Sequence, residues 1–367
     1  MARYILLLAA AVAGTYQLVA LLAALARRRP GRYRGHTPSV SILKPVRGAD
    51  PGFHEALRSN ASQDYPDFEI LFGVADPGDP AIPVIERVAR EFPRRSIRWI
   101  RTHPTTPNAK VGSLMEIAPE ARGTVLVVSD ADIRVPDGYL RDVVAPLAGP
   151  SVGLVTCAYR ARAETWPGRF EGLGVATDFG PSTMVAPFVG VDEFGLGSTL
   201  AFRREDLDRI GGFKTVSSHI ADDYQLGRSI HALGLRCLLS HVVVETHLAG
   251  RSWGHVWSHQ VRWARTLRVS RGGGYAGLPV THATLWAALC AAFGLWPAAA
   301  LLMAARYAMA ITAGWWVLGS ADTLRLWWMI PLRDLWAFGV WGAGMFGDTV
   351  EWGADRLRLT PDGRIVR

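Results

Sequence analysis

Two aspartates, Asp130 and Asp132, are the first candidates for chemistry in this chain of 367 residues. They fall in an apolar, β-branched run, residues 124–135, of the kind that forms a buried strand. Open α/β sheets bind ligands beyond the carboxyl ends of their strands. Because side chains alternate along a strand, both carboxylates would point to one side and could share a cation such as Mg²⁺ or Mn²⁺. The alternative is a helix-capping acid followed by a solvated loop acid.

Two further acids, Asp76 and Asp223, stand where a folded sheet would bring them near this pair. Asp76 follows an apolar run at residues 68–75, and Asp223 opens a helix predicted over residues 220–233. Taken alone, each is a common turn or cap residue, and an acid at a helix N-terminus is favoured by the helix dipole.

Together with a later Arg-Trp pair, these acids suit the transfer of a sugar from a nucleotide diphosphate. Asp130 and Asp132 would hold the cation, and Asp223 would act as general base on the acceptor hydroxyl. Arg262 would offer positive charge to the departing diphosphate, and Trp263 would pack against a sugar or a lipid.

The elements that must position these residues alternate between strands and helices. Strands are predicted at 39–46, 68–75, 97–102, 124–135, 152–158, 194–204 (after a glycine turn) and 236–245, and helices at 53–62, 81–92, 111–117, 220–233 and 255–268. This alternation predicts an α/β fold with a parallel, doubly wound sheet. Residues 166–184 are expected to form an interfacial helix and loop. The first turn lacks Gly-x-Gly-x-x-Gly, which argues against a dehydrogenase-type dinucleotide fold.

Apolar segments flank this α/β region. Residues 4–26 carry no charge, and about 23 residues are enough to cross a bilayer. Arg27, Arg28 and Arg29 follow, which places the next domain in the cytoplasm by the positive-inside rule. The alternative, a cleaved signal peptide, fits less well because the apolar stretch is too long and the Arg triplet follows it.

The C-terminal region contains three apolar stretches. Residues 284–303 are long enough to span, and 304–318 predict a second crossing. Residues 326–346 carry Arg333 and Asp334, so they form either a third span with a buried pair or an in-plane amphipathic helix.

Composition limits the class of protein. Charged residues make up 20% and hydrophobic residues 49%, which excludes a disordered chain. The net charge of +8 comes largely from Arg clusters beside apolar runs, which favours a membrane surface or an anionic substrate over nucleic acid. The cysteines, Cys157, Cys237 and Cys290, are too far apart for a CxxC metal site and argue against a disulfide framework.

The order of motifs resembles the ceramide glucosyltransferase family of membrane-bound, inverting glycosyltransferases with the GT-A fold. The motifs are KPVRG at 44–48, QDYP at 63–66, ADPGDPAI at 75–82, NAKV at 108–111, SDADIRV at 129–135, VGLVTC at 152–157, ADDYQLG at 221–227 and HQVRW at 259–263. The resemblance runs from about residue 39 to residue 268. It implies a UDP-sugar donor, a divalent metal and a membrane-lipid acceptor.

The family pattern of three acids followed by (Q/R)xxRW assigns roles to residues here. Asp76 would touch the nucleotide, Asp130 the metal and diphosphate, with Asp132 as partner, and Asp223 the acceptor. Asn108 and Lys110 resemble donor-site residues, and Arg262 and Trp263 close the pattern. His259 stands where the family has Gln or Arg, with Gln260 one residue on as a further donor-site candidate. In related folds a His near the last core strand is a third metal ligand. His247 is placed to be one, although a structural role is the more common.

The resemblance is nearest to the bacterial hopanoid-biosynthesis branch, through residues 202–213, HQVRWARTLR and residues 331–338. It implies transfer of GlcNAc or Glc to a bacteriohopane polyol at the inner membrane, with ceramide or diacylglycerol as alternative acceptors. The expected domains are an anchor at 1–29, a cytoplasmic GT-A domain at 36–275, a membrane region at 276–350 and a tail at 351–367. A processive polysaccharide synthase would need more spans, and an inactive membrane scaffold would have lost the acids.

Overall fold

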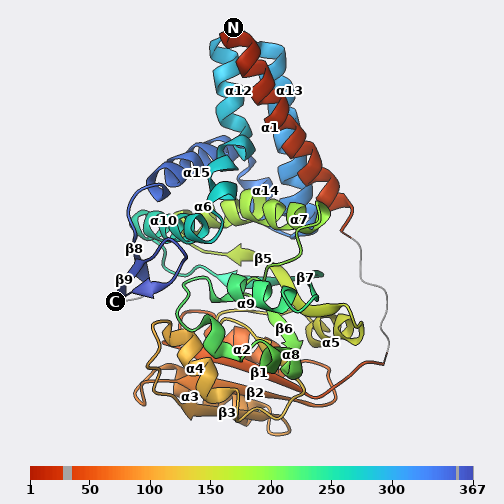
Figure 1. Cartoon of the computed structure of the whole chain (residues 1–367), viewed down its shortest axis with the longest axis vertical. Helices are drawn as coiled ribbons and strands as arrows, with labels where there is room; N and C mark the ends of the chain where they lie inside the picture. The colour runs from red at the N-terminus through yellow and green to blue at the C-terminus, as the bar shows by residue number, and fades with distance from the viewer. Residues whose placement is uncertain (28–34, 353–354, 367) are drawn as a thin grey trace. The chain divides into compact units, whose positions relative to one another are not determined.

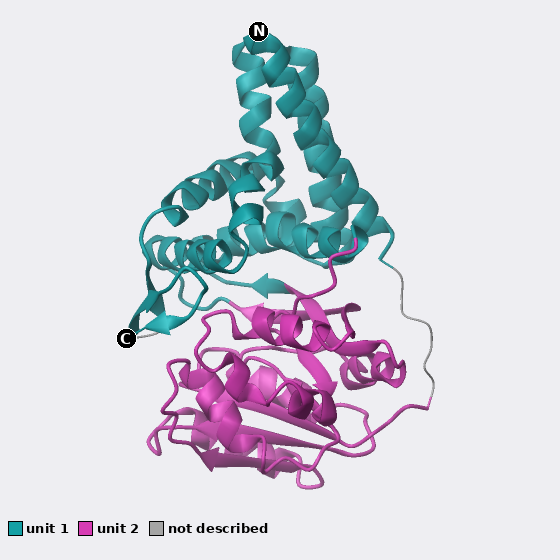
Figure 2. Cartoon of the chain, in the orientation of Figure 1, with its two compact units in different colours: residues 1–27, 160–189, 248–366 teal, residues 28–159, 190–247, 367 magenta. Residues whose placement is uncertain are grey.

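The computed structural model describes residues 1–27, 35–352 and 355–366, which fall into two compact units (Figure 2). Unit 1 comprises residues 1–27, 160–189 and 248–366, and unit 2 comprises residues 28–159 and 190–247. Residues 160–189 and 248–275, expected from the sequence to belong to the catalytic domain, therefore pack with the helical unit. Arg28 and Arg29 of the predicted Arg triplet lie outside the described residues.

Unit 2 is built on a seven-stranded sheet with the strand order β3-β2-β1-β4-β6-β5-β7 (Figure 1). The strands are β1 (Val40–Val46), β2 (Phe68–Val74), β3 (Ser96–Arg101), β4 (Val125–Val128), β5 (Val152–Arg162), β6 (Leu200–Arg203) and β7 (Arg236–His247). β3, β2, β1 and β4 are parallel, as predicted, whereas β6 is antiparallel to both β4 and β5. The sheet is therefore mixed, with a parallel half that carries the strand ends of interest.

Helices cover both faces of this sheet. They are α2 (Phe53–Ala61), α3 (Ala81–Glu91), α4 (Ala109–Ile117), α5 (Tyr139–Val144), α8 (Arg204–Arg209) and α9 (Asp222–His231). Alternation along β4 sends Val125 and Val127 into the core layer with α2, α3 and α5, and Leu126 and Val128 into the layer with α4, α8 and α9. Two buried layers explain why these strands are apolar along their whole length.

The β4 strand is much shorter than the apolar run predicted. It ends at Val128, so Asp130 and Asp132 lie in the turn that follows rather than in the strand. The argument from strand alternation for a shared side was therefore wrong. The chain leaves the sheet at Ser129, although Ile133 and Val135 beyond the turn still pack in the core layer that contains Val125 and Val127. Beyond the turn, a single antiparallel β-bridge joins Arg134 to Glu245 on β7.

Unit 1 contains a bundle formed by α1 (Ala2–Leu25), α12 (Ala283–Ala292) and α13 (Trp296–Ala310) (Figure 1). Small side chains such as Ala13, Ala287 and Ala299 fill its centre, and small residues let apolar helices approach closely. Ala2–Leu25 and Trp296–Val317 are the two described helices that are long and apolar enough to cross a membrane.

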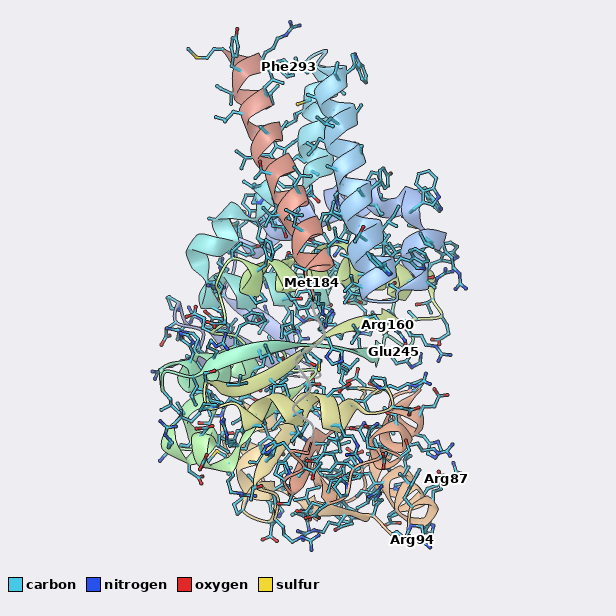
Figure 3. The ribbon with its side chains drawn as sticks, turned by 90° about the vertical axis from the view of Figure 1, so that its right-hand side faces the viewer. Arg87, Arg94, Arg160, Met184, Glu245 and Phe293 are labelled. Carbon is cyan, nitrogen blue, oxygen red and sulfur yellow. The ribbon has the colours of Figure 1, made fainter. Side chains whose placement is uncertain are left out.

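The segment 284–303 is not the single span that its length predicts. α12 ends at Ala292, Gly294 has a positive φ of 75°, and α13 begins with Pro297 in its first turn. Glycine allows the left-handed turn, and proline is suited to the first turn of the new helix. The result is a helical hairpin with Phe293 at its tip (Figure 3).

The other elements of unit 1 are mostly helical. They are α6 (Trp166–Gly174), the π-helical turn Val175–Phe179, α7 (Gly180–Phe188), α10 (Trp253–Ser270), α11 (Gly272–Gly277), the π-helical turn Ile311–Val317, α14 (Ala321–Arg325) and α15 (Ile330–Gly344). The expected tail instead contributes to an antiparallel sheet of β8 (Thr349–Trp352), β9 (Asp355–Leu359) and β10 (Ile365–Val366).

The charged residues of the segment 326–346 are buried, but they are not each other's partners. Arg306 of α13 donates to both oxygens of Asp334, at 2.9 and 2.7 Å, and Thr284 donates to the same carboxylate at 2.6 Å. A buried pair of Arg333 with Asp334 was one of the two alternatives, but Asp334 pairs with Arg306 instead, because neighbours in a helix point in different directions and α13 faces Asp334.

Candidate active site

The turn after β4 meets the glycine-rich segment before β6. Because β6 is antiparallel to β4, its start at Leu200 pairs with Val128, the last residue of β4. Gly197 therefore lies beside Asp130, whose backbone N–H donates to the Gly197 carbonyl at 3.3 Å. A methyl group at Gly197 would lie 3.2 Å from Asp130 Oδ2 and 3.4 Å from Asp223 Oδ2. The predicted site acids Asp130 and Asp223 thus converge on one glycine.

Lys110 is the cation of this cluster. It lies in the first turn of α4, and its Nζ is 2.8 Å from Asp130 Oδ1 and 3.5 Å from Asp222 Oδ2. Burial acts to lower the pKa of Lys110, but Asp130, Asp222 and Asp223 together raise it above its ordinary value. Lys110 is therefore positively charged beside the carboxylates at neutral pH.

Asp223 is held in a defined orientation at the start of α9. Its Oδ2 accepts from the Gly197 N–H at 2.7 Å, and its Oδ1 accepts from the Tyr224 N–H at 2.7 Å. Burial, and next the charge of Asp222, raise the pKa of Asp223 to about 6, while Lys110 acts to lower it. An oriented carboxylate with this pKa is well suited to accept a proton near neutral pH.

Asp132 differs from Asp130 in its surroundings. It is half-buried and accepts a hydrogen bond from the Thr246 hydroxyl on β7, whereas the side chain of Asp130 is 44% exposed. Burial and the nearby charge of Asp130 raise the pKa of Asp132. Two carboxylates that repel each other at a strand end favour a bound cation, because a cation would remove this repulsion.

Lys44 on β1 is a residue that sequence reasoning did not place in the site. It is fully buried, and its Nζ donates to Ser129 Oγ at 2.9 Å and to the Asp130 carbonyl at 3.0 Å. Burial lowers its pKa to about 8, although Asp132 and Asp130 oppose the change. A lysine within an apolar strand, at the start of the KPVRG motif, was the available signal. Lys44 fixes the turn that carries the acids.

The two remaining donor-site candidates of unit 2 differ in exposure. Asn108 is fully buried: it caps α4 through Val111 N–H at 3.2 Å and donates to the His219 carbonyl at 2.9 Å. Its visible role is to position Lys110. Asp76 is exposed after β2 and accepts from Gly78 N–H at 2.8 Å, which leaves its other oxygen at the surface.

A third metal ligand is not evident. His247 lies at the end of β7 with its Nδ1 against the Pro51 carbonyl. Within the described ranges, no group of three or more His, Cys, Asp or Glu side chains is arranged to hold a metal. The neighbouring carboxylates Asp130 and Asp132 would fit an ion that takes its other ligands from water and substrate phosphate.

The predicted residues of the (Q/R)xxRW segment all lie on α10, in unit 1. His259 Nδ1 contacts Glu171 Oε1, and its ring lies 4.7 Å from that of Trp263, one helical turn on. Gln260 accepts from the Trp336 indole N–H at 3.0 Å, and the Arg262 guanidinium lies 5.8 Å from the Trp352 ring. His259 thus forms a charged or hydrogen-bonded pair with Glu171, which no sequence motif indicated.

Comparison with known proteins identifies the family. Residues 3–365 match the model of glycosyl transferase family 21. The chain belongs to this family. The resemblance to ceramide glucosyltransferases, predicted from the motifs, is confirmed.

Two relatives illustrate the similarity of this family 21 member to ceramide glucosyltransferases. It is 26% identical over 206 residues to ceramide glucosyltransferase 1 of Caenorhabditis elegans, an alignment that covers 55% of this chain and 44% of the relative. It is 24% identical over 281 residues to the ceramide glucosyltransferase of Pyricularia oryzae, covering 62% and 57%. The chain thus spans about half the length of the curated relatives it matches.

A solved structure confirms the fold. The mannosyltransferase PcManGT from Pyrobaculum calidifontis, in complex with GDP-Man and Mn²⁺, matches with a TM-score of 0.59 and 21% identity over 92% of this chain and 98% of that one. The predicted α/β fold of the GT-A type is therefore correct.

Proposed function

We propose that this family 21 member transfers a hexose from a UDP-sugar to a hydroxyl of a membrane lipid, with inversion at the anomeric carbon. The observation that carries the proposal is the convergence of Asp130, Lys110 and Asp223 on Gly197 at the end of β4. Similarity to ceramide glucosyltransferases supports the lipid acceptor, and the GDP-Man and Mn²⁺ of PcManGT support a nucleotide sugar and a divalent cation.

In this mechanism Asp223 is the general base. The proton of the acceptor hydroxyl passes to Asp223 as the acceptor oxygen bonds to the anomeric carbon, and the bond from that carbon to the diphosphate breaks. The Gly197 and Tyr224 N–H groups keep the carboxylate oriented, so no reorganisation is needed at the moment of transfer. The electron pair of the broken bond leaves with UDP.

The charges around the diphosphate have separate tasks. Asp130 and Asp132 would hold a Mg²⁺ or Mn²⁺ ion, which when bound supplies positive charge to the diphosphate oxygens. Lys110 keeps Asp130 in place and adds a fixed positive charge. We extend the proposal to Asp76 as the contact to the nucleotide and to Asn108 as the residue that positions Lys110.

The roles proposed for the α10 residues rest on the positions that these residues occupy in the (Q/R)xxRW motif. Arg262 offers charge to the leaving diphosphate, and Trp263 contacts the sugar or the lipid. The position of Gln260 beside the motif predicts that it contacts the donor sugar nucleotide. Its burial and its bond to Trp336 favour instead a role within unit 1.

For the acceptor, we propose a bacteriohopane polyol, with GlcNAc or Glc as the sugar, at a bacterial inner membrane with the catalytic residues on the cytoplasmic side. The two apolar helices of membrane-spanning length support the membrane location. Ceramide is the alternative that the relatives favour, and diacylglycerol has the same chemistry.

One experiment tests the reaction and the acceptor together. The full chain in vesicles is supplied with UDP-Glc or UDP-GlcNAc and with ceramide, diacylglycerol or a bacteriohopane polyol, and products are measured by mass spectrometry. We expect one lipid to gain a hexose, Asp223→Asn to abolish this, and the exposed Asp208→Asn to leave it unchanged. Undiminished transfer by Asp223→Asn would disprove the base assignment.

The cation is tested separately. EDTA should stop transfer, Mn²⁺ or Mg²⁺ should restore it, and Asp130→Asn should require more metal than the unchanged chain. Full activity in EDTA would exclude the proposed ion.

A further inference from the structure

Several buried polar atoms of unit 1 have no hydrogen-bond partner among the residues that the structure describes. Among them are Glu171 Oε2, Gln260 Nε2, His282 Nδ1, and Arg333 Nε and Nη1. All four side chains belong to residues no more than 6% exposed. Glu171 Oε2 lies 3.9 Å from Arg251 Nε, beyond hydrogen-bond distance. Buried polar groups are almost always satisfied, so a cluster of unsatisfied ones requires an explanation.

Arg333 is the centre of this cluster. Its guanidinium lies across Gly174: a methyl group there would be 2.1 Å from Arg333 Nε and 2.3 Å from Nη2. Glu171 and Asp178 precede and follow Gly174 by about one turn, so the glycine opens a gap between two acids on one side of the helix. Both acids are anionic neighbours of Arg333.

Asp334 does not satisfy Arg333. Its two carboxylate oxygens accept from Arg306 and Thr284. Arg333 therefore has a buried charge with anionic neighbours on several sides but no bond from Nε or Nη1 to any described residue. His282 has the same neighbours, Asp178 and Asp334, and burial lowers its pKa.

An aromatic wall lines the other side of the cluster. The Phe170 ring lies 5.7 Å from the Arg333 guanidinium and 5.5 Å from the Trp336 ring. Trp253 packs against both rings, at 5.4 and 5.9 Å. The Trp336 N–H is bonded to Gln260 Oε1, which leaves the Gln260 amide N–H₂ for another partner.

The helix that carries the acids is irregular at this point. Residues 175–179 form a π-helical turn between α6 and α7, and such turns are common at functional sites. Asp178, an anionic neighbour of Arg333 within the turn, is partly exposed.

We propose that this cluster binds the uncharged polar head group, with its hydroxyl and amide groups, of the lipid that accepts the sugar. The cluster presents an acceptor at Glu171 and donors at Gln260 and Arg333, and a head group with both donors and acceptors matches that set. Glu171 and Asp178 beside Arg333 would repel a phosphate. The aromatic wall suits the apolar part of the lipid next to the head group. The inference rests on the proposed function for the identity of the lipid as acceptor.

A pair of glycine substitutions on α6 tests the site. Gly174→Ala displaces the Arg333 guanidinium, whereas a methyl group at Gly172 meets atoms of Ala161 at 3.4 Å and beyond, which are ordinary contacts. We expect Gly174→Ala to raise the KM for the lipid about tenfold and to leave the KM for the UDP-sugar within twofold. Gly172→Ala should match the unchanged chain in both. Equal lipid KM values for the two variants would overturn the proposal.

Arg333→Met separates binding from a structural role. Methionine keeps much of the volume but removes a buried charge that lacks a bonded partner. A merely structural arginine predicts lower thermal stability, because Glu171 and Asp178 lose a neighbouring positive charge, and an unchanged lipid KM. The head-group site predicts a raised lipid KM, with the KM for the UDP-sugar unchanged. If Gly174→Ala does not fold, the lipid KM of Arg333→Met still tests whether the cluster binds the head group.

Direct binding distinguishes failure of this site from failure of the proposed function. The full chain in vesicles is irradiated with a ceramide that carries a diazirine beside its amide, and labelled peptides are identified. We expect labels on α6, α10 or α15, competition by unlabelled bacteriohopane polyol, none by phosphatidic acid, and loss in Arg333→Met. These labels without any sugar transfer would support the site and refute the proposed reaction. Sugar transfer without them would refute the site alone.

Discussion

At the scale of residues, the candidate site depends on a glycine as much as on its acids. Gly197 brings Asp130, Lys110 and Asp223 together because its lack of a side chain leaves room between two carboxylates. Its N–H also holds Asp223. The acids are recognisable in the sequence by their motifs, whereas the need for glycine at this position follows only from the distances.

Gly197→Ala should therefore impair catalysis without unfolding the chain. The added methyl group would lie 3.2 Å from Asp130 Oδ2 and 3.4 Å from Asp223 Oδ2, so the carboxylates must shift by tenths of an ångström. We expect kcat to fall about tenfold or more, equivalent to about 1.4 kcal/mol in the barrier. The thermal midpoint should stay close to that of the unchanged chain. An unaltered kcat would show that the close approach of Asp130 and Asp223 at Gly197 does not affect sugar transfer.

The pH dependence should reflect Asp223. A base with a raised pKa of about 6 is protonated, and so inactive, below that pH. The rate should thus fall about tenfold per pH unit below about 6 and level off above it. Measuring kcat/KM from pH 5 to 8 checks this, with circular dichroism to confirm that the chain stays folded. A flat profile over that range would contradict the assignment.

At the scale of elements, the turn after β4 is positioned by its neighbours rather than by its own strand. Lys44 of β1 holds it from within unit 2, and the Gly197 carbonyl bonds it from the segment before β6. Thr246 of β7 donates to Asp132 from a third strand. The site acids therefore depend on long-range contacts of the sheet.

Lys44→Met should reduce activity and alter how stability responds to pH. The folded-state pKa of about 8 lies below the ordinary 10.5, so the unfolded chain binds the more protons between these values. Lys44 therefore makes wild-type stability rise as pH increases from about 8 to 10.5, and this contribution disappears in Lys44→Met. Urea unfolding of both forms at pH 7.5 and 10 measures the difference. Parallel changes in both forms would show that Lys44 is not a buried, titrating amine.

At the scale of the whole molecule, the chain consists of an α/β unit and a helical unit that alternate along the sequence. The chain passes from unit 2 to unit 1 within β5, at residues 159–160, and returns before β6, and residues 248–366 belong to unit 1 again (Figure 2). The helical hairpin α12–α13 lies beside α1, and a methyl group at Gly294 would be 3.8 Å from Arg3 Nη2. The hairpin tip therefore lies at the N-terminal end of α1.

This arrangement predicts the side of a membrane on which the tip lies. Phe293→Cys should react with a membrane-impermeant maleimide from the same side as a cysteine placed at residue 1. Phe293 is 46% exposed, and the native cysteines are buried, so labelling reports the introduced residue. A single span over 284–303 would instead place residue 293 in the bilayer centre and prevent labelling. The chain without an introduced cysteine gives the background level of maleimide labelling.

The sequence by itself determined the parallel half of the sheet and marked the acids Asp76, Asp130 and Asp223 as candidates, because apolar periodicity and local motifs are short-range properties. Only the tertiary structure decided that β4 ends at Val128, that β6 runs antiparallel, that Gly294 divides a predicted span and that Asp334 pairs with Arg306. Each of these features depends on which segment, distant in the sequence, packs or pairs with the residues concerned. The roles of Lys44 and Gly197 also could not be predicted from the sequence. The role of a buried amine or of a missing side chain depends on residues that lie far away along the chain.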